Sequence, residues 1–578
     1  MSLTNRQRAI FWTVAAISAA TRFLAQARSL WDWDESLFCL AMRDYDVTSH
    51  HPHPPGFPVY IAFAKLLRLI VASDFHALQA LNLIAGVLAF PAVYLFARQL
   101  GLRFETSVVA GALFVFFPNV WFFGGTAFSD VPSIVLVLFA VVFLFRGRES
   151  RRDYFIGTVL LALAIGIRPQ NLLVGLFPGL WATVRRRPWE ILAALLVGVA
   201  IVGFSFGAAI HATGELKEYM RVIREHSDYI ARIDSFRSPT RPALWRLFDR
   251  FFLKQYQSAA LSILTSLFVI TSWVGAIRKR DRSMLFNLLT FGPFAVAAWM
   301  MLDRYSISRF SIGYAPMFAV FAADGIRRAV SRRPSFEPFV GAALAAAFFI
   351  WTLPALAPVR NELSPSAQAV AAAQREIDPK SETLFVGYSM VPFVEYLAPE
   401  LPFIRVIGYA AAPLTPAEHP FLLAELQRGE EDGLVFRRER GRLWNIARRH
   451  YFEVALKPLT NIPVFESGWY DAERDGHDER RWMAGRSVTI LPPATDTREL
   501  RLLFTVPSPQ IGARVTVLLN GKVLETIIIG AIEVARDYEV APAPGGLPNR
   551  LELSIDRTFV ENDREQGLRM RFLGWGRP

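Results

Sequence analysis

Long apolar runs recur through the first two thirds of the chain and constrain its fold more than any other feature. A helix of about 20 apolar residues crosses the hydrocarbon core of a bilayer. Candidate spans lie at residues 9–27, 77–97, 105–123, 131–145, 154–167, 171–184, 189–210, 257–277, 283–302, 310–326 and 337–356. The sequence therefore predicts a polytopic α-helical membrane protein with about 11 transmembrane helices. The short runs at 154–167 and 171–184 fit either two tilted helices or one broken hairpin.

Composition and charge agree with a membrane protein. Hydrophobic residues make up 53% of the chain, and the mean hydropathy is +0.28, above the apolar share of ordinary soluble domains. The net charge of +12 raises nucleic acid as a partner. However, the Lys and Arg residues lie mostly in short loops between apolar runs, which is the pattern that orients membrane proteins. We therefore expect membrane lipid, and no nucleic acid, among the partners.

The basic loops also predict an orientation. Five of them face the cytoplasm if the N-terminus does, as the positive-inside bias requires; they lie at residues 98–103, 146–152, 185–187, 278–282 and 327–333. The loop at 211–255 departs from this bias, because the same orientation places it outside although it carries nine Lys and Arg residues. The basic start leads into an apolar run without a clear cleavage site, which favours a first span over a removed signal peptide. We expect a multi-pass protein of a bacterial cytoplasmic membrane, with its C-terminal part extracytoplasmic.

Three domains are expected. Residues 1–356 hold the spans. Residues 357–465 alternate helical stretches with short apolar strands, which predicts a small α/β segment. Residues 466–578 contain short alternating or β-branched runs and favour a β-sandwich or jelly roll. Strands are predicted at 487–491, 500–505, 514–519, 523–529 and 550–555, and Asn520-Gly521 is a strong hairpin signal between two of them.

The first external loop carries the most chemistry. Five acidic residues and three of the nine histidines fall within 22 positions, from Asp32 to His53. Asp34 and Glu35 precede a short apolar stretch at 36–42 that fits a helix at the membrane interface. One interpretation is that Asp34 caps this helix and Glu35 supports its first turn. The other is that one carboxylate is a general base, with a pKa raised by partial desolvation.

His50, His51 and His53 allow more than one interpretation. Imidazole is a common metal ligand, but the spacing matches no strong zinc signature. A divalent metal therefore stays open, and no other cofactor is indicated. A hydrogen bond from His53 to substrate is the alternative, and a plain structural turn is a further one for His50 and His51.

Four motifs, in order, resemble those of a known family. They are Asp34-Glu35 with His53-Pro54-Pro55, then Phe128-Ser129-Asp130-Val131-Pro132, then Gly166-Ile167-Arg168-Pro169, then Arg309-Phe310 with Pro316. Together they resemble the GT-C fold glycosyltransferases, in particular the protein O-mannosyltransferase and aminoarabinose-transferase-like group. The resemblance covers roughly residues 10–330. Phe310 replaces the usual Tyr and Arg168 stands where Lys is frequent, which leaves the sugar specificity open.

The resemblance implies a GT-C-like membrane domain that performs an inverting transfer. The donor would be a polyprenyl-phosphate sugar, and the acceptor a glycan, lipid or protein outside the cytoplasm. By position, Asp34 would be the general base with Glu35 next in line, and Asp130 would orient a substrate. The lipid phosphate would be neutralised by Arg168, Arg304 and Arg309.

Electrostatics supports a phosphate site independently. An arginine beside a span is costly unless it is paired or hydrated, and its guanidinium matches phosphate oxygens in a fork geometry. Fixed cations also stabilise the charge that develops on a leaving phosphate. For Arg304 the competing interpretation is an interfacial residue that pairs with Asp303.

Two further regions have open roles. In the basic loop, 215–233 and 245–256 fit amphipathic helices, either as a cationic lid over a lipid phosphate or as a surface for anionic head groups. In the terminal β domain, Trp469, Tyr470 and Trp482 fit either sugar-stacking positions or core positions. A sandwich fold alone does not imply sugar binding.

Two other function classes compete with an enzyme. A lipid or glycan transporter or flippase would also have many spans and intramembrane arginines. We find no inverted repeat, and the acidic cluster lies in a loop. A non-catalytic membrane scaffold that binds envelope glycan is the second alternative.

Overall fold

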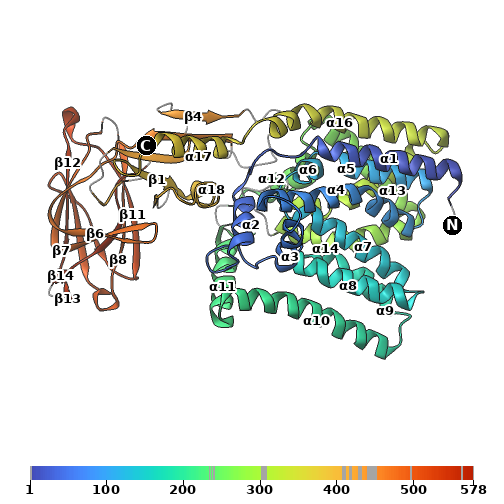
Figure 1. The fold of residues 1–578 in the computed structure, drawn as a ribbon, viewed down its shortest axis with the longest axis horizontal. Helices are drawn as coiled ribbons and strands as arrows, with labels where there is room; N and C mark the ends of the chain where they lie inside the picture. The colour runs from blue at the N-terminus through green and yellow to red at the C-terminus, as the bar shows by residue number, and fades with distance from the viewer. Residues whose placement is uncertain are drawn as a thin grey trace. The chain divides into compact units, whose positions relative to one another are not determined.

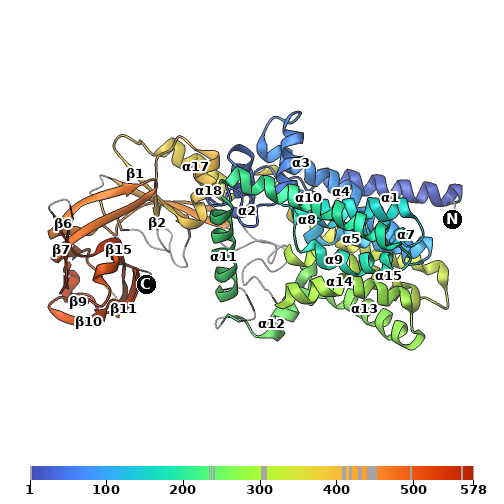
Figure 2. The ribbon, with the colours of Figure 1, turned by 90° about the horizontal axis from the view of Figure 1, so that it is seen from below.

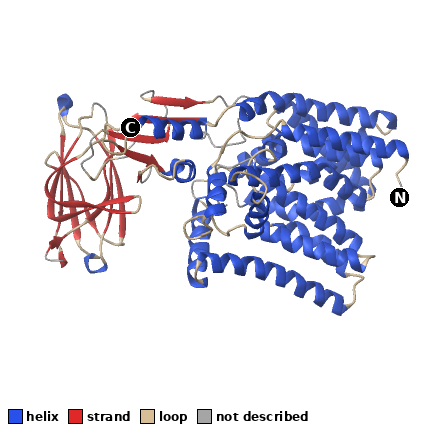
Figure 3. Ribbon diagram, viewed as in Figure 1, coloured by secondary structure: helices blue, strands red, loops and turns tan. Residues whose placement is uncertain are grey.

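The computed structural model describes residues 3–233, 235, 237–238, 241–300, 309–406, 412–415, 419–426, 433–438, 452–494, 497–561 and 564–576. The described chain forms two compact units, residues 3–364 and residues 365–438 with 452–576. The first unit is helical, and the second contains the strands (Figure 3).

The helical unit contains a helix in each apolar run that the sequence singles out (Figure 1). Its α-helices are α1 (Asn5–Phe23), α2 (Trp33–Arg43), α3 (Pro58–Arg68), α4 (Asp74–Gln99), α5 (Phe104–Phe116), α6 (Pro118–Phe123), α7 (Asp130–Gly147), α8 (Arg151–Ile167), α9 (Asn171–Thr183), α10 (Pro188–Thr213), α11 (Leu216–Ile233), α12 (Leu244–Phe248), α13 (Ala259–Lys279), α14 (Arg282–Met300), α15 (Ala315–Ala329) and α16 (Glu337–Asn361). The runs at 154–167 and 171–184 form separate helices, α8 and α9, because the chain leaves helical geometry at Arg168.

Six helical stretches of the described chain are long and apolar enough to cross a membrane. They are α4, α7, α10, α13, α14 and the stretch that contains α16. The helices α5 and α9 are apolar but shorter. The polytopic helical class is therefore confirmed, and the count of about 11 spans stays a prediction.

Helix α2 is held by a different cap from the one expected. Its N-cap is Asp32, whose extended backbone lets the carboxylate accept a hydrogen bond from the Asp34 N–H at 3.1 Å. The expectation that Asp34 caps the helix is wrong, whereas Glu35 supports the first turn as the partner in a capping box. Residues 36–42 are buried within the protein, so this stretch of α2 does not face lipid.

The histidine- and proline-rich segment after α2 folds into a compact turn. Asp46 and His51 form an antiparallel bridge through two backbone hydrogen bonds, of 2.7 and 2.8 Å. Gly56 ends the turn with a φ of +103°, and a Cβ there would lie 2.5 Å from the Tyr45 hydroxyl oxygen. Only glycine combines this backbone angle with this close approach. The turn leads directly into α3.

The basic segment at 211–255 contains both expected helical stretches. The first is α11, which crosses the end of α10 (Figures 1 and 2). The second consists of α12 followed by a π-helical turn (Asp249–Leu253) and a 3₁₀ turn (Lys254–Tyr256). Whether they form a cationic lid or a head-group surface stays a prediction.

Within the described residues, the second unit contains two larger sheets and a separate two-stranded one. The first has the order β2-β1-β3-β5-β4, with β1 parallel to β2 and β3 and the remaining pairs antiparallel. Its strands are β1 (Thr383–Gly387), β2 (Ile404–Val406), β3 (Pro420–Glu425), β4 (Leu434–Arg437) and β5 (Glu453–Pro458), accompanied by α17 (Pro365–Glu376) and α18 (Val391–Leu397).

The second sheet has eight strands in the order β10-β9-β12-β7-β15-β8-β11, with β6 paired to β7. Its strands are β6 (Val464–Asp475), β7 (Asp478–Leu491), β8 (Arg498–Thr505), β9 (Arg514–Leu519), β10 (Lys522–Ile528), β11 (Glu533–Val540), β12 (Asn549–Ile555) and β15 (Arg569–Trp575). A separate pair joins β13 (Phe559–Glu561) to β14 (Arg564–Gln566). Side chains from both halves of the large sheet share one apolar core, so the predicted sandwich is seen in part.

Local predictions in this sheet agree with the structure. Asn520 and Gly521, both with positive φ, connect β9 to β10 as the hairpin signal predicts. Trp469 packs against the sheet core and donates a hydrogen bond to the Val488 carbonyl oxygen at 3.0 Å. The Tyr470 hydroxyl donates to the Glu565 carbonyl oxygen at 2.7 Å, and the Trp482 ring lies 5.7 Å from that of Phe559. A sugar-binding role for these aromatics stays a prediction.

Two loops of the helical unit are tied together at Gly125. The Ala27 N–H donates to the Gly125 carbonyl oxygen at 2.9 Å, and the Gln79 amide donates to the carbonyl oxygens of both residues. A Cβ at Gly125 would lie 1.8 Å from the Ala25 carbonyl oxygen. Backbone therefore contacts backbone here, and no side chain can yield to make room.

Gly125→Ala should lower the thermal stability of the full-length protein, because overpacking costs about 1–3 kcal/mol. The measurement is the melting temperature of the protein in detergent. Gly203→Ala in α10 is the matched control, since a Cβ there meets nothing within 4 Å. Equal melting temperatures for the two variants would contradict this account of the loop contact.

Candidate active site

Asp34 lies in the first turn of α2 and pairs with an arginine from a distant segment. The Arg309 Nη1 donates to Asp34 Oδ2 at 2.5 Å. Arg309 begins a 3₁₀ turn (Arg309–Gly313) that leads into α15. The side chain of Asp34 is 18% exposed and that of Arg309 is 10% exposed, so the pair is largely removed from water. Burial costs less free energy for a guanidinium bonded to a carboxylate than for either ion alone.

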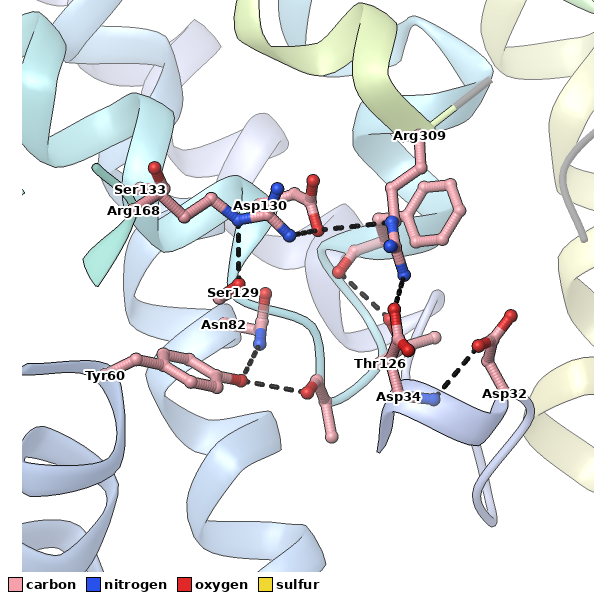
Figure 4. Close-up of polar contacts among 12 residues, drawn as sticks. Asp32, Asp34, Tyr60, Asn82, Thr126, Ser129, Asp130, Ser133, Arg168 and Arg309 are labelled. Carbon is pink, nitrogen blue, oxygen red and sulfur yellow. Dashed lines mark hydrogen bonds and ion pairs between the residues drawn. The ribbon is translucent and has the colours of Figure 1, made fainter. Parts of the chain in front are cut away.

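A second ion pair joins the start of α7 to the end of α8. The Arg168 Nη2 donates to Asp130 Oδ2 at 2.7 Å, and its Nε donates to the Ser129 hydroxyl at 2.9 Å. Arg309 Nε lies 3.8 Å from the same Asp130 oxygen. Figure 4 shows the resulting row, in which Asp34, Arg309, Asp130 and Arg168 alternate in charge.

The charge of Arg309 is secured by its neighbours. Burial alone lowers the pKa of its guanidinium, but the carboxylates of Asp34 and Asp130 outweigh burial, and the pKa is raised overall. Its Nε is buried without a hydrogen-bond partner. Arg309 therefore stays cationic and keeps a donor nitrogen for a further acceptor.

His53 lies on the other side of Asp34. Its Nδ1 is 3.9 Å from Asp34 Oδ1 and is buried without a hydrogen-bond partner. Its ring packs against those of Phe38 and Phe57, at centroid distances of 5.7 and 4.8 Å. Burial lowers the pKa of His53 to about 4 even though Asp34 raises it, so the imidazole is neutral at neutral pH.

Glu35 has a different environment from Asp34. One of its oxygens accepts backbone N–H bonds from Trp31 at 2.6 Å and Asp32 at 2.9 Å, and the other accepts from Ala127 at 2.7 Å. Burial raises the pKa of Glu35 to about 8, against the lowering effect of these N–H donors. Its contacts join the segment that precedes α2 to the loop before α7. The role of Glu35 as second candidate base stays a prediction.

Three further residues that the sequence singles out are His50, His51 and Arg304. His50 and His51 lie in the turn before α3, with the His50 N–H bonded to the Val47 carbonyl oxygen at 3.2 Å. Arg304 lies outside the residues that the structure describes. Within the described ranges, no group of three or more His, Cys, Asp or Glu side chains is arranged to hold a metal ion.

Several supporting residues escape sequence reasoning. The Tyr60 hydroxyl donates to the Ala127 carbonyl oxygen at 2.9 Å and accepts from Asn82 at 3.3 Å. The Asn171 amide donates to the Ser133 hydroxyl at 2.8 Å, next to the break that presents Arg168. Ser129 directly precedes Asp130 in one of the four motifs, and this position is its only indication of a role in the sequence. Tyr60, Asn82 and Asn171 stand in apolar stretches of sequence, which do not indicate their hydrogen-bond partners.

Comparison with solved structures finds membrane glycosyltransferases. ArnT from Cupriavidus metallidurans, bound to undecaprenyl phosphate, is 11% identical with a TM-score of 0.49 and matches over 78% of this chain and 98% of its own. The Archaeoglobus fulgidus oligosaccharyltransferase, tethered with an acceptor peptide, is 11% identical with a TM-score of 0.44, and the match covers 67% of this chain and 63% of that one. The arabinofuranosyltransferase AftD from Mycobacteria is 10% identical with a TM-score of 0.41, and the match covers 99% of this chain and 61% of that one.

These neighbours are GT-C glycosyltransferases, which is the resemblance that the motifs indicate. The chain spans about three fifths of the length of the oligosaccharyltransferase and of AftD. No protein-family model and no curated protein sequence matches it.

The geometry offers a defined chemistry. The Asp34 carboxylate lies beside the neutral imidazole of His53 and the guanidinium of Arg309. A second guanidinium, that of Arg168, is bonded to Asp130. Such a site can accept a proton from a hydroxyl and stabilise an anionic leaving group within one small volume. The two carboxylates and two guanidinium groups of the row balance one another in charge.

Glu35→Ala should destabilise the protein, because three buried N–H groups lose their acceptor at about 1–3 kcal/mol each. The melting temperature in detergent should fall well below that of wild type. Glu105→Ala is the control, since the Glu105 side chain is exposed at the start of α5. A Glu35→Ala protein as stable as the control would rule out the loop-joining role.

Proposed function

We propose that this chain transfers a sugar from a polyprenyl-phosphate donor to an acceptor hydroxyl, with inversion at the anomeric carbon. The carrying observation is the buried row of Asp34, Arg309, Asp130 and Arg168, from four separate segments. Buried charges of this kind are costly to assemble, and charged groups that converge in this way are typical of functional sites. The acceptor is a glycan, a lipid or a protein.

Asp34 acts as the general base in this proposal. It takes the proton of the acceptor hydroxyl while the acceptor oxygen attacks the anomeric carbon. Arg309 bonds to one of its oxygens and so fixes the direction of the carboxylate. Asp130 is two contacts away, bonded to Arg168, which suits an orienting role better than proton transfer.

Arg168 and Arg309 hold the donor phosphate. When the bond from sugar to phosphate breaks, the phosphate gains one negative charge, and fixed guanidinium groups favour that state. The Nε of Arg309 supports this assignment, because it is buried without a hydrogen bond and has only the longer ion-pair contact to Asp130, at 3.8 Å. His53 contributes a hydrogen-bonding nitrogen beside the base, and no step in this scheme requires a metal.

We further propose residues 1–356 as the catalytic membrane domain, with the 357–465 and 466–578 segments outside the cytoplasm. The basic loops support a cytoplasmic N-terminus. In this orientation the acidic first loop and the strand-rich segments share the extracytoplasmic side of a bacterial cytoplasmic membrane.

Asp34→Asn should reduce kcat by about 10²–10⁴-fold, since the amide cannot accept the proton. The assay follows release of undecaprenyl phosphate from a panel of undecaprenyl-phosphate sugars by the purified full-length protein. Asp44→Asn, an exposed acid of the same loop, should behave as wild type. Undiminished transfer by Asp34→Asn would remove the base assignment, and a wild type inactive with every donor would favour a transporter or scaffold.

Arg309→Lys and Arg168→Lys should weaken binding of undecaprenyl phosphate by about tenfold or more, because an ammonium loses the guanidinium fork and a charged hydrogen bond contributes about 1.5–3 kcal/mol. Binding is measured by displacement of a fluorescent lipid-phosphate probe. Arg43→Lys is the matched control, since Arg43 pairs with Asp74 and is 46% exposed. Lysine variants with wild-type affinity would place the lipid phosphate elsewhere.

A further inference from the structure

Three histidines from two separate segments lie in a row beside Asp34. His53 is closest, with its Nδ1 3.9 Å from Asp34 Oδ1. His226, from α11, follows at a ring-centroid distance of 6.3 Å from His53, and His50 lies 6.5 Å from His226. His226 belongs to the basic external segment, to which the motifs assign no role.

Helix α11 is firmly attached to the first loop, so the position of His226 is built into the fold. The Tyr219 hydroxyl donates to the Pro55 carbonyl oxygen at 2.7 Å. Tyr219 and Val222 are buried against Val47 from the first loop. His226 follows Val222 by one helical turn, and this places its ring over the same loop.

The proposed reaction leaves a proton on Asp34 that has to be removed, and the row of histidines offers a path for it. The acceptor O–H bond breaks, its oxygen bonds to the anomeric carbon, and the bond from that carbon to the phosphate oxygen breaks. The phosphate diester becomes a monoester with one more negative charge, and the proton stays on Asp34. Asp34 must lose this proton before the next turnover, yet Arg309 and His53 enclose it, and its side chain is only 18% exposed.

His53 has the properties of a transient proton acceptor. Its Nδ1 faces Asp34 and has no hydrogen-bond partner. The charged and titratable groups that act on it are Asp34, Arg309, Arg168 and His226, and burial with the two arginines keeps the ring neutral. A neutral ring can take a proton, and a low affinity for it ensures rapid release. His226 is likewise disfavoured as a cation, by burial and by His50.

We infer that His53 and His226 form a relay that carries the proton from Asp34 to solvent after each sugar transfer. The Asp34 O–H bond breaks as Nδ1–H forms on His53, and the proton on His53 Nε2 passes to His226 through one bridging water. Exchange of the Nδ1 proton for one on Nε2 through water then restores the starting tautomer of His53. His226, which is partly exposed, releases a proton to bulk water. No oxidant, reductant or metal enters the balance. The inference rests on the proposed function and extends its site to α11.

The competing interpretation is that both imidazoles only fill space over the first loop. A packing role changes stability and substrate affinity, whereas a relay changes turnover and its response to proton carriers. The relay and the packing role therefore differ in kcat, in KM and in chemical rescue.

The test uses the full-length protein with an undecaprenyl-phosphate sugar that wild type consumes. His226→Ala and His53→Gln should each lower kcat by about tenfold or more, in the range of proton-transfer contributions, with the donor KM unchanged. Added imidazole should restore most of the His226→Ala activity. His211→Ala, an exposed histidine at the end of α10, should match wild type with and without imidazole.

Each outcome bears on the relay. A wild-type kcat in His226→Ala, or a loss that neither imidazole nor a small buffer relieves, overturns it. If His226→Ala lowers the melting temperature, the His226→Asn variant is used in its place. A kcat of that variant that rises with buffer concentration supports the relay, and a kcat that does not depend on buffer concentration overturns it. Inactive wild type overturns the proposed function and the relay with it, whereas active wild type with unaffected histidine variants overturns the relay alone.

Discussion

The contact between Asp34 and Arg309 governs the arrangement of the site. A buried carboxylate or guanidinium without a partner costs several kcal/mol, whereas a bonded pair recovers much of that cost. Arg309 also faces Asp130, which in turn bonds Arg168. Each of the four charges thus has an opposite neighbour, and loss of any one changes the charge balance around the others. For this reason substitutions in the row should not be additive.

Charges of this kind come from the ends of helices, where side chains can reach one another across the unit. Asp34 lies in the first turn of α2, Asp130 starts α7, and Arg168 ends α8. Helix ends are less constrained than helix interiors, so their positions must be secured by other contacts. Glu35, Gln79 and Tyr60 supply these contacts through hydrogen bonds to backbone groups of the two site loops.

Much of the architecture could be predicted because its signals are local. Apolar runs predict helices, and Asn520-Gly521 predicts a hairpin from two residues alone. The cap of α2 could not be predicted in the same way, since Asp32 and Asp34 both stand at the start of the helix and only the backbone conformation selects Asp32.

The four charged residues of the candidate site can be singled out from the sequence, but their contacts with one another cannot. Asp34, Asp130, Arg168 and Arg309 stand out by type and by position beside apolar runs. The bond between Asp34 and Arg309 joins residues 275 positions apart, and no periodicity carries such information. The approach of His226 to His53 is hidden in the sequence for the same reason, because the two rings come from segments far apart in the chain.

Main-chain groups anchor the two site loops. Glu35 bonds to the main-chain N–H groups of Trp31, Asp32 and Ala127, and Tyr60 bonds to the main-chain carbonyl oxygen of Ala127. Every amino acid except proline provides the same N–H groups, so the anchors themselves do not depend on the side chains at residues 31 and 127, which packing constrains because both are buried. The position of the segment that carries Asp34 is therefore set by main-chain groups, and not by the chemical type of the side chains around it.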